Sequence, residues 1–553
     1  MQPDRPVWVT ALGGVGEVGK NATLLECDGQ ALLIDCGSQF PSPEHLGIDL
    51  IIPDFSYVTS NPASLLGVVL SHAHEDHIGA VPFFLRQVGS GVDLYGSNLT
   101  LAMVRARMRR RREEQFARYR AVEPGHTVSI GPFRVHFISV GHSVPDATAL
   151  RIETPAGAFF FTGDFKFTTE TGEIDRASLW RFGDQGVRAL FSDCVRVEMP
   201  GRTPPESTVT ATLDRVVKDA RGRVIVASFA SNLSRIRNVL GIAQEHGRKV
   251  AIAGRGLTTS IEVASELGYI VAEPGQMISL AEADRLPAGD VLIIATGAQG
   301  EPTAALSRMA VGDHREIRVR EGDTVVLSST PVPGNEESVA RTIDNLFRRG
   351  ANVIWSSIEP QVHVSGHAAR EELGELVRLL RPEFAVPLHG EYRMQVLYRR
   401  LAIENGVAPE KVRFLDIGHS LRFDRDGATD DGTIPAGSVL VDGIEIGGVD
   451  DTVLRDRRHL SGDGIVIVSV AMARDTGEIL RAPEVIARGV AAENHVATAL
   501  DAVGQAVDRA LRDLDPSELD VSFVHGRVQD VARAVFRQSS GPRPLILPVV
   551  VEV

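Results

Sequence analysis

Short apolar runs separated by polar loops fill the first part of the chain, a pattern typical of buried β-strands. Residues 31–34, 67–70 and 159–161 are apolar runs, and residues 134–138 alternate between polar and apolar side chains. Each segment leads within a few positions to a histidine or an aspartate. Since α/β proteins place their chemistry where buried strands end, this pattern predicts an α/β fold with functional groups at strand ends.

A second pattern, in which strand-like and helix-like segments alternate, occupies the middle of the chain. The strands are expected at residues 223–227, 249–253, 291–295 and 324–327. Helix-forming stretches begin at Ser231 and Thr258. This alternation predicts a parallel, doubly wound sheet.

The C-terminal part has a different character. Residues 424–450 are rich in Gly and Asp and are predicted to be a linker with one or two strands. Strands are expected at residues 465–472 and 545–553. Two helices are indicated by apolar positions at helical spacing: Leu500, Val503, Val507 and Leu511, then Val528, Val531 and Val535. We therefore expect a small α+β domain from residue 451 onward.

Composition narrows the class of protein. The 553 residues suffice for three or four domains, and 43% hydrophobic with 24% charged residues is typical of a soluble globular chain. No apolar run approaches the ~20 residues of a membrane span, and the first six residues do not resemble a signal peptide, so a cytoplasmic location without a membrane partner is expected. Three cysteines without a Cys-x-x-Cys pair argue against a disulfide framework.

The formal net charge of −14 argues against a protein that coats nucleic acid by bulk attraction. A nuclease stays open, because metals and nearby arginines set the field at a site. Residues 101–120 contain eight arginines and are predicted to form a helix. A solvated helix face is the favoured interpretation of these arginines, and contact with RNA is the alternative.

Residues 14–21 fit the dinucleotide-binding glycine pattern and most of a phosphate-binding loop. Both interpretations require a helix next, whereas residues 22–35 are strand-like, with a turn at Asp28 and Gly29. Asn21 also stands where a phosphate-binding loop needs Ser or Thr. We interpret this segment as a flexible loop beside a metal site.

Residues 71–79 carry three imidazoles and a carboxylate within six positions: His72, His74, Asp76 and His77. In an extended segment His72 and His74 point the same way and can share one metal, while Asp76 and His77 turn toward a second. A lone histidine is usually a core or surface residue, but this cluster favours two divalent ions.

The cluster resembles the His-x-His-x-Asp-His signature of the metallo-β-lactamase superfamily. That resemblance implies an αββα sandwich with two metals at one edge of the paired sheets. It also implies further site residues that this chain supplies in order: Asp35, His142, Asp164 and His389. Asp164 takes the place of the carboxylate that bridges both metals.

The 225 positions between Asp164 and His389 exceed what one connection needs, so they must contain an inserted domain. The insertion resembles the β-CASP domain of nucleic-acid-processing members of the superfamily. Asp193, His367 and His389 match motif positions of that branch, where histidine at the last position accompanies RNA substrates and valine accompanies DNA end-processing enzymes. We expect the hydrolase domain at 1–188 and 358–423, the β-CASP domain at 189–357, the linker at 424–450 and the α+β domain at 451–553.

Residues 228–232, 296–302, 363–367 and 389–393 together resemble the ribonuclease J family over almost the entire chain. The family implies 5′-to-3′ exonuclease action on single-stranded RNA with a 5′-monophosphate, with additional endonuclease action, in mRNA decay and rRNA processing. It also implies a homodimer, with partners in an RNA-degradation complex left open. One departure is Cys194-Val195-Arg196, where small polar residues are expected, so any contact made there is in question.

The resemblance assigns His72, His74 and His142 to one metal and Asp76, His77 and His389 to the other, with Asp164 shared. Two Zn²⁺ ions per subunit suit the imidazole-rich set, and Mn²⁺ or Mg²⁺ could replace them. His367 is the candidate acid for the leaving 3′ oxygen, with Asp76 and Asp193 as further catalytic residues. A 5′-phosphate pocket is predicted from Ser231, Asn232, His363, Ser365, Gly366 and His367. Helix capping and a tight turn explain Ser231, Asn232 and Ser365 equally well.

Three other functions are alternatives to RNA cleavage. A DNA nuclease of the same branch is opposed by His389. A hydrolase of small esters or lactams would not need the long insertion. A non-catalytic RNA-binding scaffold would be expected to have lost ligands, and none of the seven is missing. The valine-rich last strand, residues 548–553, is predicted to pair between subunits of a homodimer.

Overall fold

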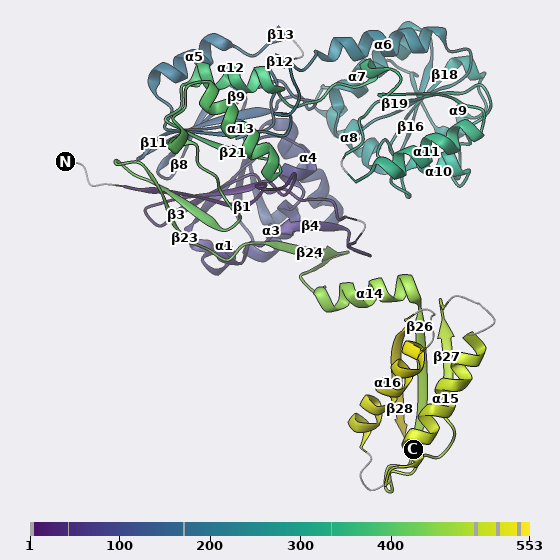
Figure 1. Cartoon of the computed structure of the whole chain (residues 1–553). Helices are drawn as coiled ribbons and strands as arrows, with labels where there is room; N and C mark the ends of the chain where they lie inside the picture. The colour runs from purple at the N-terminus through teal and green to yellow at the C-terminus, as the bar shows by residue number, and fades with distance from the viewer. Residues whose placement is uncertain are drawn as a thin grey trace. The chain divides into compact units, whose positions relative to one another are not determined.

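Two β-sheets packed face to face form the centre of the hydrolase part of the molecule (Figure 1). The computed structural model describes residues 5–42, 44–169, 172–332, 334–490, 496–515, 520–538 and 543–553. The chain divides into two compact units, which are described separately. The first contains the chain up to Phe40 and from Leu50 to Val439, and the second contains Pro41–Asp49 and Leu440–Val553.

The first sheet of this sandwich has eight strands. In sheet order they are β23 (Ala428–Thr433), β22 (His419–Phe423), β1 (Val7–Gly13), β2 (Ala22–Cys27), β3 (Gln30–Ile34), β5 (Leu65–Val69), β6 (Val92–Gly96) and β7 (Ala117–Ala121). Strands β3, β5, β6 and β7 run parallel. Of these, β3 and β5 have largely apolar sequences and are mostly buried, whereas alternate residues of β6 are only partly buried and β7 is largely exposed.

The second sheet has six strands: β21 (Phe384–Leu388), β14 (Ala189–Asp193), β11 (Gly157–Phe161), β10 (Thr148–Thr154), β9 (Phe133–Ser139) and β8 (Thr127–Ile130). Side chains from both sheets share one core, in which Leu32 and Val69 pack with Phe137 and Phe159. On the outer face, α5 (Arg176–Gln185), α12 (Arg370–Leu380) and α13 (Tyr392–Glu404) cover the second sheet. The predicted αββα sandwich is therefore confirmed.

The inserted domain contains a sheet of six parallel strands: β17 (Met277–Ile278), β16 (Lys249–Ala253), β18 (Val291–Ala295), β15 (Val224–Ala227), β19 (Thr324–Leu327) and β20 (Asn352–Trp355). Helices lie on both faces of it (Figure 1): α6 (Glu206–Asp219), α7 (Leu233–Glu245), α8 (Arg255–Glu266), α9 (Leu280–Ala283), α10 (Ala305–Val311) and α11 (Glu336–Arg348). The doubly wound insertion is confirmed.

Residues that follow the insertion complete both hydrolase sheets. Strand β21 lies parallel to β14 in the second sheet, and β22 lies antiparallel to β1 in the first. The hydrolase part is thus built from two chain segments that are far apart in sequence.

The helix predicted over residues 101–120 is wrong in its second half. Helix α4 covers Asn98–Arg111 and ends because Arg112 adopts a left-handed conformation with φ 59°. Arg118 and Arg120 lie instead on β7, next to β6, and both pair with Asp93.

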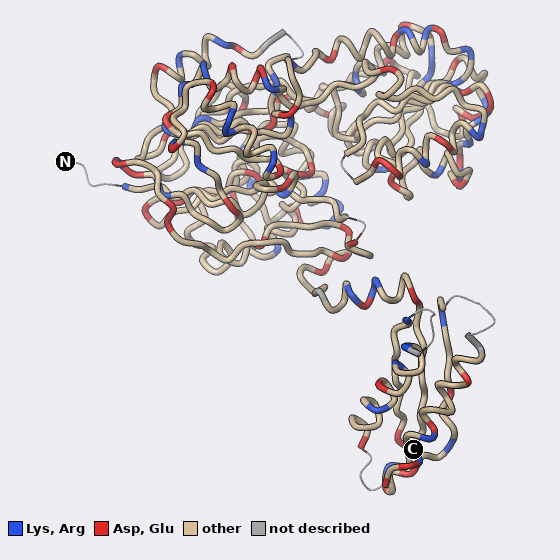
Figure 2. The backbone as a smooth tube through the Cα atoms, viewed as in Figure 1, with Lys and Arg blue, Asp and Glu red and all other residues tan. Residues whose placement is uncertain are grey.

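Most of the other arginines of this run are also engaged within the protein, as on an ordinary solvated face. Arg105 and Arg109 both pair with Glu114, and the Arg111 guanidinium lies 4.5 Å from the centre of the Phe83 ring. Across the described chain, acidic and basic side chains are interspersed (Figure 2). These contacts agree with a solvated helix face, and contact of the arginine run with RNA stays a prediction.

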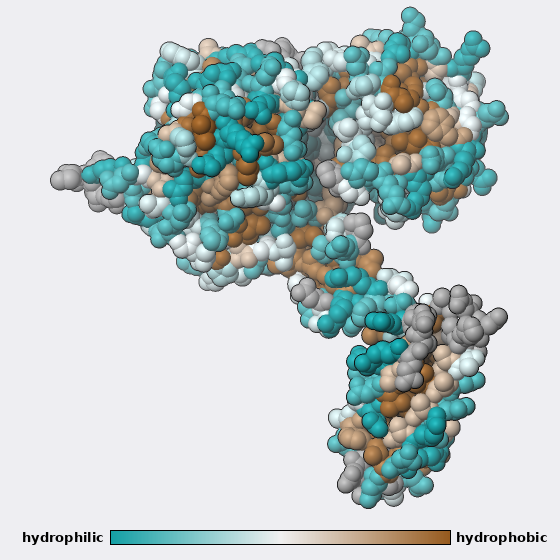
Figure 3. Space-filling model, viewed as in Figure 1, coloured by the Kyte–Doolittle hydropathy of each residue, from teal (hydrophilic) through white to brown (hydrophobic). Residues whose placement is uncertain are grey.

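The second unit is a small α+β domain, as predicted. Its sheet has the order β27 (Glu484–Arg488), β26 (Ile465–Met472) and β28 (Leu545–Glu552), with helices α14 (Asp451–Asp463), α15 (Val496–Arg512) and α16 (Val521–Gln538). Side chains such as Val466 and Val468 are buried against α15 and α16. Alternate side chains of β28 are exposed: Leu547, Val549 and Val551 are 43%, 38% and 46% accessible. Apolar surface is visible on this unit in Figure 3.

Among the described helices, none combines the length and the apolar character needed to cross a bilayer.

Candidate metal centre

The histidine cluster forms the connection between β5 and a short helix, α2 (Glu75–Ile78). His74 has extended backbone and immediately precedes α2, while Asp76 and His77 lie within it. Asn21 holds this turn, because its backbone N–H and its side-chain amide both donate to Asp76 O, at 2.9 and 3.1 Å. Cys36 N–H donates to His77 O at 2.8 Å. The cluster is therefore positioned by the loops at the start of β2 and the end of β3.

The remaining ligands come from the ends of strands in the second sheet. His142 follows β9, Asp164 follows β11 and His389 follows β21. His389 has a left-handed φ of 46°, and its N–H donates to Gly14 O at 2.6 Å. Both imidazoles and Asp164 are buried. The strand ends thus bring residues from distant parts of the sequence to one place.

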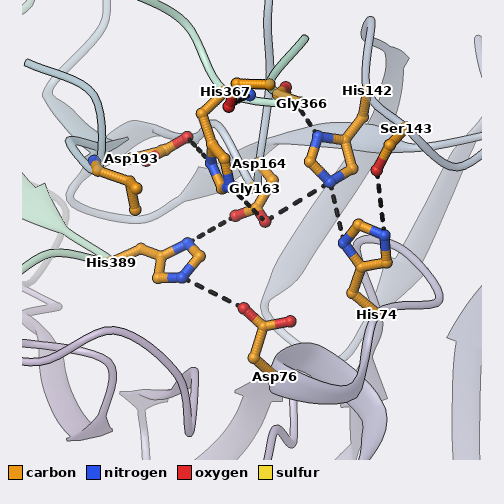
Figure 4. A network of polar contacts seen from close by, with 12 residues as sticks. His74, Asp76, His142, Ser143, Gly163, Asp164, Asp193, Gly366, His367 and His389 are labelled. Atoms are coloured by element: carbon orange, nitrogen blue, oxygen red, sulfur yellow. Dashed lines mark hydrogen bonds and ion pairs between the residues drawn. The ribbon is translucent and has the colours of Figure 1, made fainter. Parts of the chain in front are cut away.

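All seven predicted ligands meet in two groups that share Asp164. Figure 4 labels His74, Asp76, His142, Asp164 and His389 among them. In each group the candidate ligand atoms lie within 4.8 Å of one another. The first group is His72, His74, His142 and Asp164, and the second is Asp76, His77, Asp164 and His389. This is the partition expected from the resemblance.

Three buried atoms at the centre of these groups lack a well-formed hydrogen bond within the described protein: His72 Nε2, Asp164 Oδ2 and His389 Nε2. They face other ligands, since His72 Nε2 lies 3.5 Å from Asp164 Oδ2 and His389 Nε2 lies 3.2 Å from Asp76 Oδ2. Burying such atoms without a partner costs free energy. Divalent cations between the two sets of ligands would satisfy all three atoms. The residues present therefore fit a two-metal centre of mixed nitrogen and oxygen donors.

The electrostatics of the site also suit cations. Burial lowers the pKa of His72 and His142 well below the ordinary value, and it lowers the pKa of His74 to about 4. These imidazoles are consequently neutral near pH 7, the form that binds metal. At His389 the effect of burial is outweighed by Asp164 and Asp76, which raise its pKa to about 10. The two carboxylates that stabilise the protonated His389 ring would also attract a divalent cation. Binding of that cation to His389 would release the proton.

A surrounding set of hydrogen bonds orients the ligands. Asp35, in a left-handed conformation with φ 57°, accepts from Ser71 N at 2.7 Å and from Ser71 Oγ at 2.9 Å. Its Oδ2 also lies 2.7 Å from His77 Nδ1, which turns His77 Nε2 toward Asp164. Such carboxylate–histidine contacts fix the ring of a metal ligand. Asp35 therefore belongs to the support of the site and to neither ligand group. The roles of Ser71 and Asn21 were not predictable from a local sequence pattern.

His142 is oriented by the loop at Gly366, whose carbonyl oxygen accepts from His142 Nδ1 at 2.8 Å. A Cβ at position 366 would lie 2.5 Å from Cε1 and 2.6 Å from Nδ1 of this ring. We expect Gly366→Ala to displace His142 and to lower activity and metal affinity by roughly 10- to 100-fold. Metal titration of the variant measures this. Gly241→Ala is the matched control, because a Cβ at position 241 in α7 meets no atom within 4 Å; equal metal affinity in the two variants would contradict the prediction.

His367 lies beside both groups. Its Nδ1 is 2.8 Å from Asp193 Oδ2, and its Nε2 is 3.9 Å from Asp164 Oδ2. Asp193 is held in turn by Val195 N–H at 2.9 Å. Burial alone would lower the pKa of His367, but Asp193 and Asp164 raise it. Asp193, His367 and His389 also form a third group of potential ligands, so the position of His367 is compatible with either a proton donor or a metal ligand.

The residues predicted for a 5′-phosphate pocket are partly brought together. Ser365 Oγ accepts from His367 N–H at 3.1 Å, beside Gly366. Asn232 caps α7 by accepting from Arg235 N–H at 3.1 Å, and Ser231 precedes it. The same Arg235 lies 3.0 Å from His363 Nδ1 and so joins the two segments. The capping interpretation of Asn232 is therefore satisfied in this structure, and Arg235 is a residue of this region that the sequence did not single out.

The glycine-rich loop, residues 14–21, lies beside the metal centre. It forms isolated bridges with Glu391 and Gly390 and is followed by strand β2, not by a helix. This excludes the arrangement that a nucleotide-binding loop requires. The segment Cys194-Val195-Arg196 departs from the family pattern. Its Cys194 thiol is buried and donates to Leu388 O at 3.3 Å, and Arg196 Nε is buried without a partner in the described chain.

The sandwich, the insertion and the two ligand groups define the class of this protein as a metallo-β-lactamase-type hydrolase with a β-CASP domain. Models of known families match in the same order. They are the metallo-beta-lactamase superfamily over residues 15–212, the Ribonuclease J beta-CASP domain over 221–346, the Zn-dependent metallo-hydrolase RNA specificity domain over 357–412 and the Ribonuclease J C-terminal domain over 452–553.

Two relatives match over essentially their full lengths. Ribonuclease J2 of Bacillus subtilis (strain 168) is 35% identical over 559 residues, which cover 99% of both chains. Ribonuclease J 2 of Staphylococcus aureus (strain MRSA252) is 35% identical over 559 residues, which cover 100% of this chain and 99% of that one. The chain belongs to the ribonuclease J family. A solved structure of a protein of unknown function from Enterococcus faecalis V583 shares the fold, with a TM-score of 0.54 and 16% identity over 75% of this chain and 99% of that one.

Proposed function

We propose that this protein is a two-metal-dependent ribonuclease that degrades and processes single-stranded RNA in the cytoplasm. Its main action is 5′-to-3′ exonucleolytic, with a preference for 5′-monophosphate ends, and it also cuts internally. The observation that carries the proposal is the convergence of seven ligands into two groups sharing Asp164, in a chain of the ribonuclease J family. The match to an RNA specificity domain over residues 357–412 supports RNA over DNA.

Each group of ligands would hold one ion, with Zn²⁺ best suited to the imidazoles and Mn²⁺ or Mg²⁺ as substitutes. When bound, such a pair of ions lowers the pKa of water toward ~7 and neutralises charge on the phosphate. The protein's own contribution is to fix the geometry. Asp35 and Ser71 orient His77 and His72, and Gly366 orients His142.

His367 is the proposed proton donor to the leaving 3′ oxygen. Its Nδ1 is engaged by Asp193, which leaves Nε2 facing Asp164 and the ligand groups. A histidine held in this way presents one defined N–H to the reacting bond. Asp193 then positions His367. Asp76 contributes to catalysis as a ligand of the second group.

The 5′-phosphate would be received by Ser231, Asn232, His363, Ser365 and Gly366. Burial and the nearby Arg235 lower the pKa of His363 to about 3, so this ring is neutral near pH 7. It can therefore serve as a hydrogen-bond donor to phosphate without adding charge.

The proposal is tested by metal analysis together with time-resolved digestion of one RNA prepared with a 5′-monophosphate, a 5′-triphosphate or a 5′-hydroxyl. A matched DNA strand serves as the control. We expect mononucleotides to accumulate first from the 5′-monophosphate RNA. Cleavage of DNA at an equal rate would indicate instead a DNA end-processing nuclease of the same branch, and RNA binding without cleavage would indicate a scaffold.

We also propose a homodimer in which the second unit supplies part of the contact, since β28 is an edge strand with exposed Leu547, Val549 and Val551. Partners in an RNA-degradation complex are compatible with this surface as well. Removing residues 451–553 should convert the dimer to a monomer and weaken cleavage of structured RNA, while metal binding persists because all ligands precede the cut. Light scattering measures the mass, and an unchanged dimer after truncation would contradict the interface.

A further inference from the structure

A pocket lined by arginines lies in the inserted domain, at the end of its sheet opposite the metal centre. It encloses about 300 Å³ and is lined by Arg315, Arg318, Arg320, Arg349, Asp284 and Glu316, with one apolar residue beside them. We call it the arginine pocket.

The arginine pocket and the metal centre lie toward opposite ends of strand β19. After the carboxyl end of β19, Ser328 Oγ donates to Val362 O at 2.6 Å, on the segment that leads to His367. Before its amino end, Arg318 and Arg320 line the pocket. A strand of this length spans about 13 Å, so the arginine pocket and the metal centre are distinct sites.

The backbone that carries these arginines is held firmly. Arg223 Nη2 donates to Arg318 O at 2.6 Å, and Arg320 N–H donates to Asp323 Oδ2 at 2.8 Å. Ile317 and Val319 are buried in the core of the domain. Because alternate side chains of an extended segment point to opposite sides, Arg318 and Arg320 are directed outward together.

The pocket carries more positive than negative charge, with four arginines against two carboxylates. Asp284 is already engaged, by Arg320 Nη2 at 2.5 Å and by Arg223 Nη1 at 3.4 Å. The side chains of Arg315 and Arg318 are exposed and make no hydrogen bond or ion pair with any residue that the structure describes. With Asp284 engaged, Arg315 and Arg318 leave an excess of positive charge over Glu316 in the pocket, which a bound anion would offset.

We propose that the arginine pocket binds phosphates of an RNA strand away from the cleavage site. Guanidinium groups match phosphate oxygens bidentately. No aromatic side chain lines the pocket, so it lacks the stacking surface that a nucleotide base would use. This favours the sugar–phosphate backbone over a free nucleotide. The choice of RNA as the polyanion rests on the proposed function, and the role is to hold the distal part of a long substrate.

The test compares the full-length protein with its Arg315→Gln/Arg318→Gln variant in equilibrium binding of a phosphorothioate-linked RNA that resists hydrolysis. For a strand of about 40 nucleotides we expect affinity to fall roughly 10-fold, and the slope of log affinity against log salt to become shallower by about 1.4, that is ~0.7 for each lost phosphate contact. Binding of a pentanucleotide, which occupies the cleavage site alone, should not change.

Two control variants show whether an effect comes from the charge of this pocket. One tests for an effect of net charge alone, and the other tests for misfolding. Arg181→Gln/Arg341→Gln removes two exposed arginines elsewhere in the first unit and should leave the salt slope unchanged. The Arg315→Lys/Arg318→Lys variant should keep most of the salt slope of the unmodified protein. An unaltered slope in the glutamine variant, equal loss for the pentanucleotide, or full competition by a mononucleotide or by polyglutamate would overturn the proposal. Failure of RNA cleavage would refute the proposed function alone, because this readout measures binding without cleavage.

Discussion

Asp164→Ala is expected to abolish RNA cleavage, with a loss of more than about 10³-fold, as is typical when a strong electrostatic contact is removed from an active site. Asp164 belongs to both ligand groups and lies 2.7 Å from His389 Nδ1 and 3.2 Å from His77 Nε2. Its removal would leave the five imidazoles of the two groups without their shared carboxylate. We expect metal content, measured by elemental analysis, to fall in parallel with the rate.

His77→Ala should have a similar effect on the rate, because Asp76, Asp164 and His389 are the other ligands of its group and none of them can replace the missing nitrogen. His459→Ala, in the second unit, is the matched control, since His459 is exposed and lies outside every ligand group of the described chain. A rate near that of the unmodified protein, with both metals retained, would refute the ligand assignment.

His367→Ala is expected to lower the cleavage rate by roughly 10²–10⁴ while metal content stays unchanged, because general acid catalysis typically contributes that much. The prediction follows from the 2.8 Å contact with Asp193, which directs the other ring nitrogen of His367 toward the ligand groups. An RNA with a 3′-bridging sulfur provides a separate readout. Since thiolate leaves without protonation, the variant should recover most of its rate on this substrate.

Asp193→Asn tests the positioning of His367 independently. It keeps the size of the side chain but removes the charge that holds Nδ1, so we expect a smaller loss than in His367→Ala and the same recovery with the sulfur substrate. If metal content falls in His367→Ala, then His367 is a ligand, as the third group of donors allows, and the acid lies elsewhere.

The alternation of the insertion and the histidine cluster are predictable from local signals, whereas the αββα sandwich and the ligands His142, Asp164 and His389 were expected from the family resemblance. Each ligand outside the histidine cluster follows an apolar strand closely, and strand ends of a sandwich meet at one edge. The C-terminal domain is equally predictable, since helical and strand periodicities are clear there. The helix end at Arg112 is not, because it depends on one residue adopting a left-handed backbone conformation.

The supporting contacts could not be predicted for a different reason. Asp35 can reach both Ser71 and His77 only because its own backbone is left-handed, and the need for glycine at position 366 arises from the His142 ring 224 positions away. The arginine pocket likewise joins Asp284, Arg318 and Arg349 from three separate segments. These features depend on tertiary packing, which no local pattern encodes.

The division of the hydrolase fold by its insertion has a consequence during synthesis. Strands β21 and β22 complete the two sheets, and His367 and His389 enter the chain only after the inserted domain. A nascent chain emerging from the ribosome therefore lacks His389 of its second ligand group, and the proposed proton donor His367, until the inserted domain has been translated. The messenger RNA that encodes the protein is close at hand throughout this period, so the order of segments delays the appearance of a complete site until residue 389 of 553 has been added.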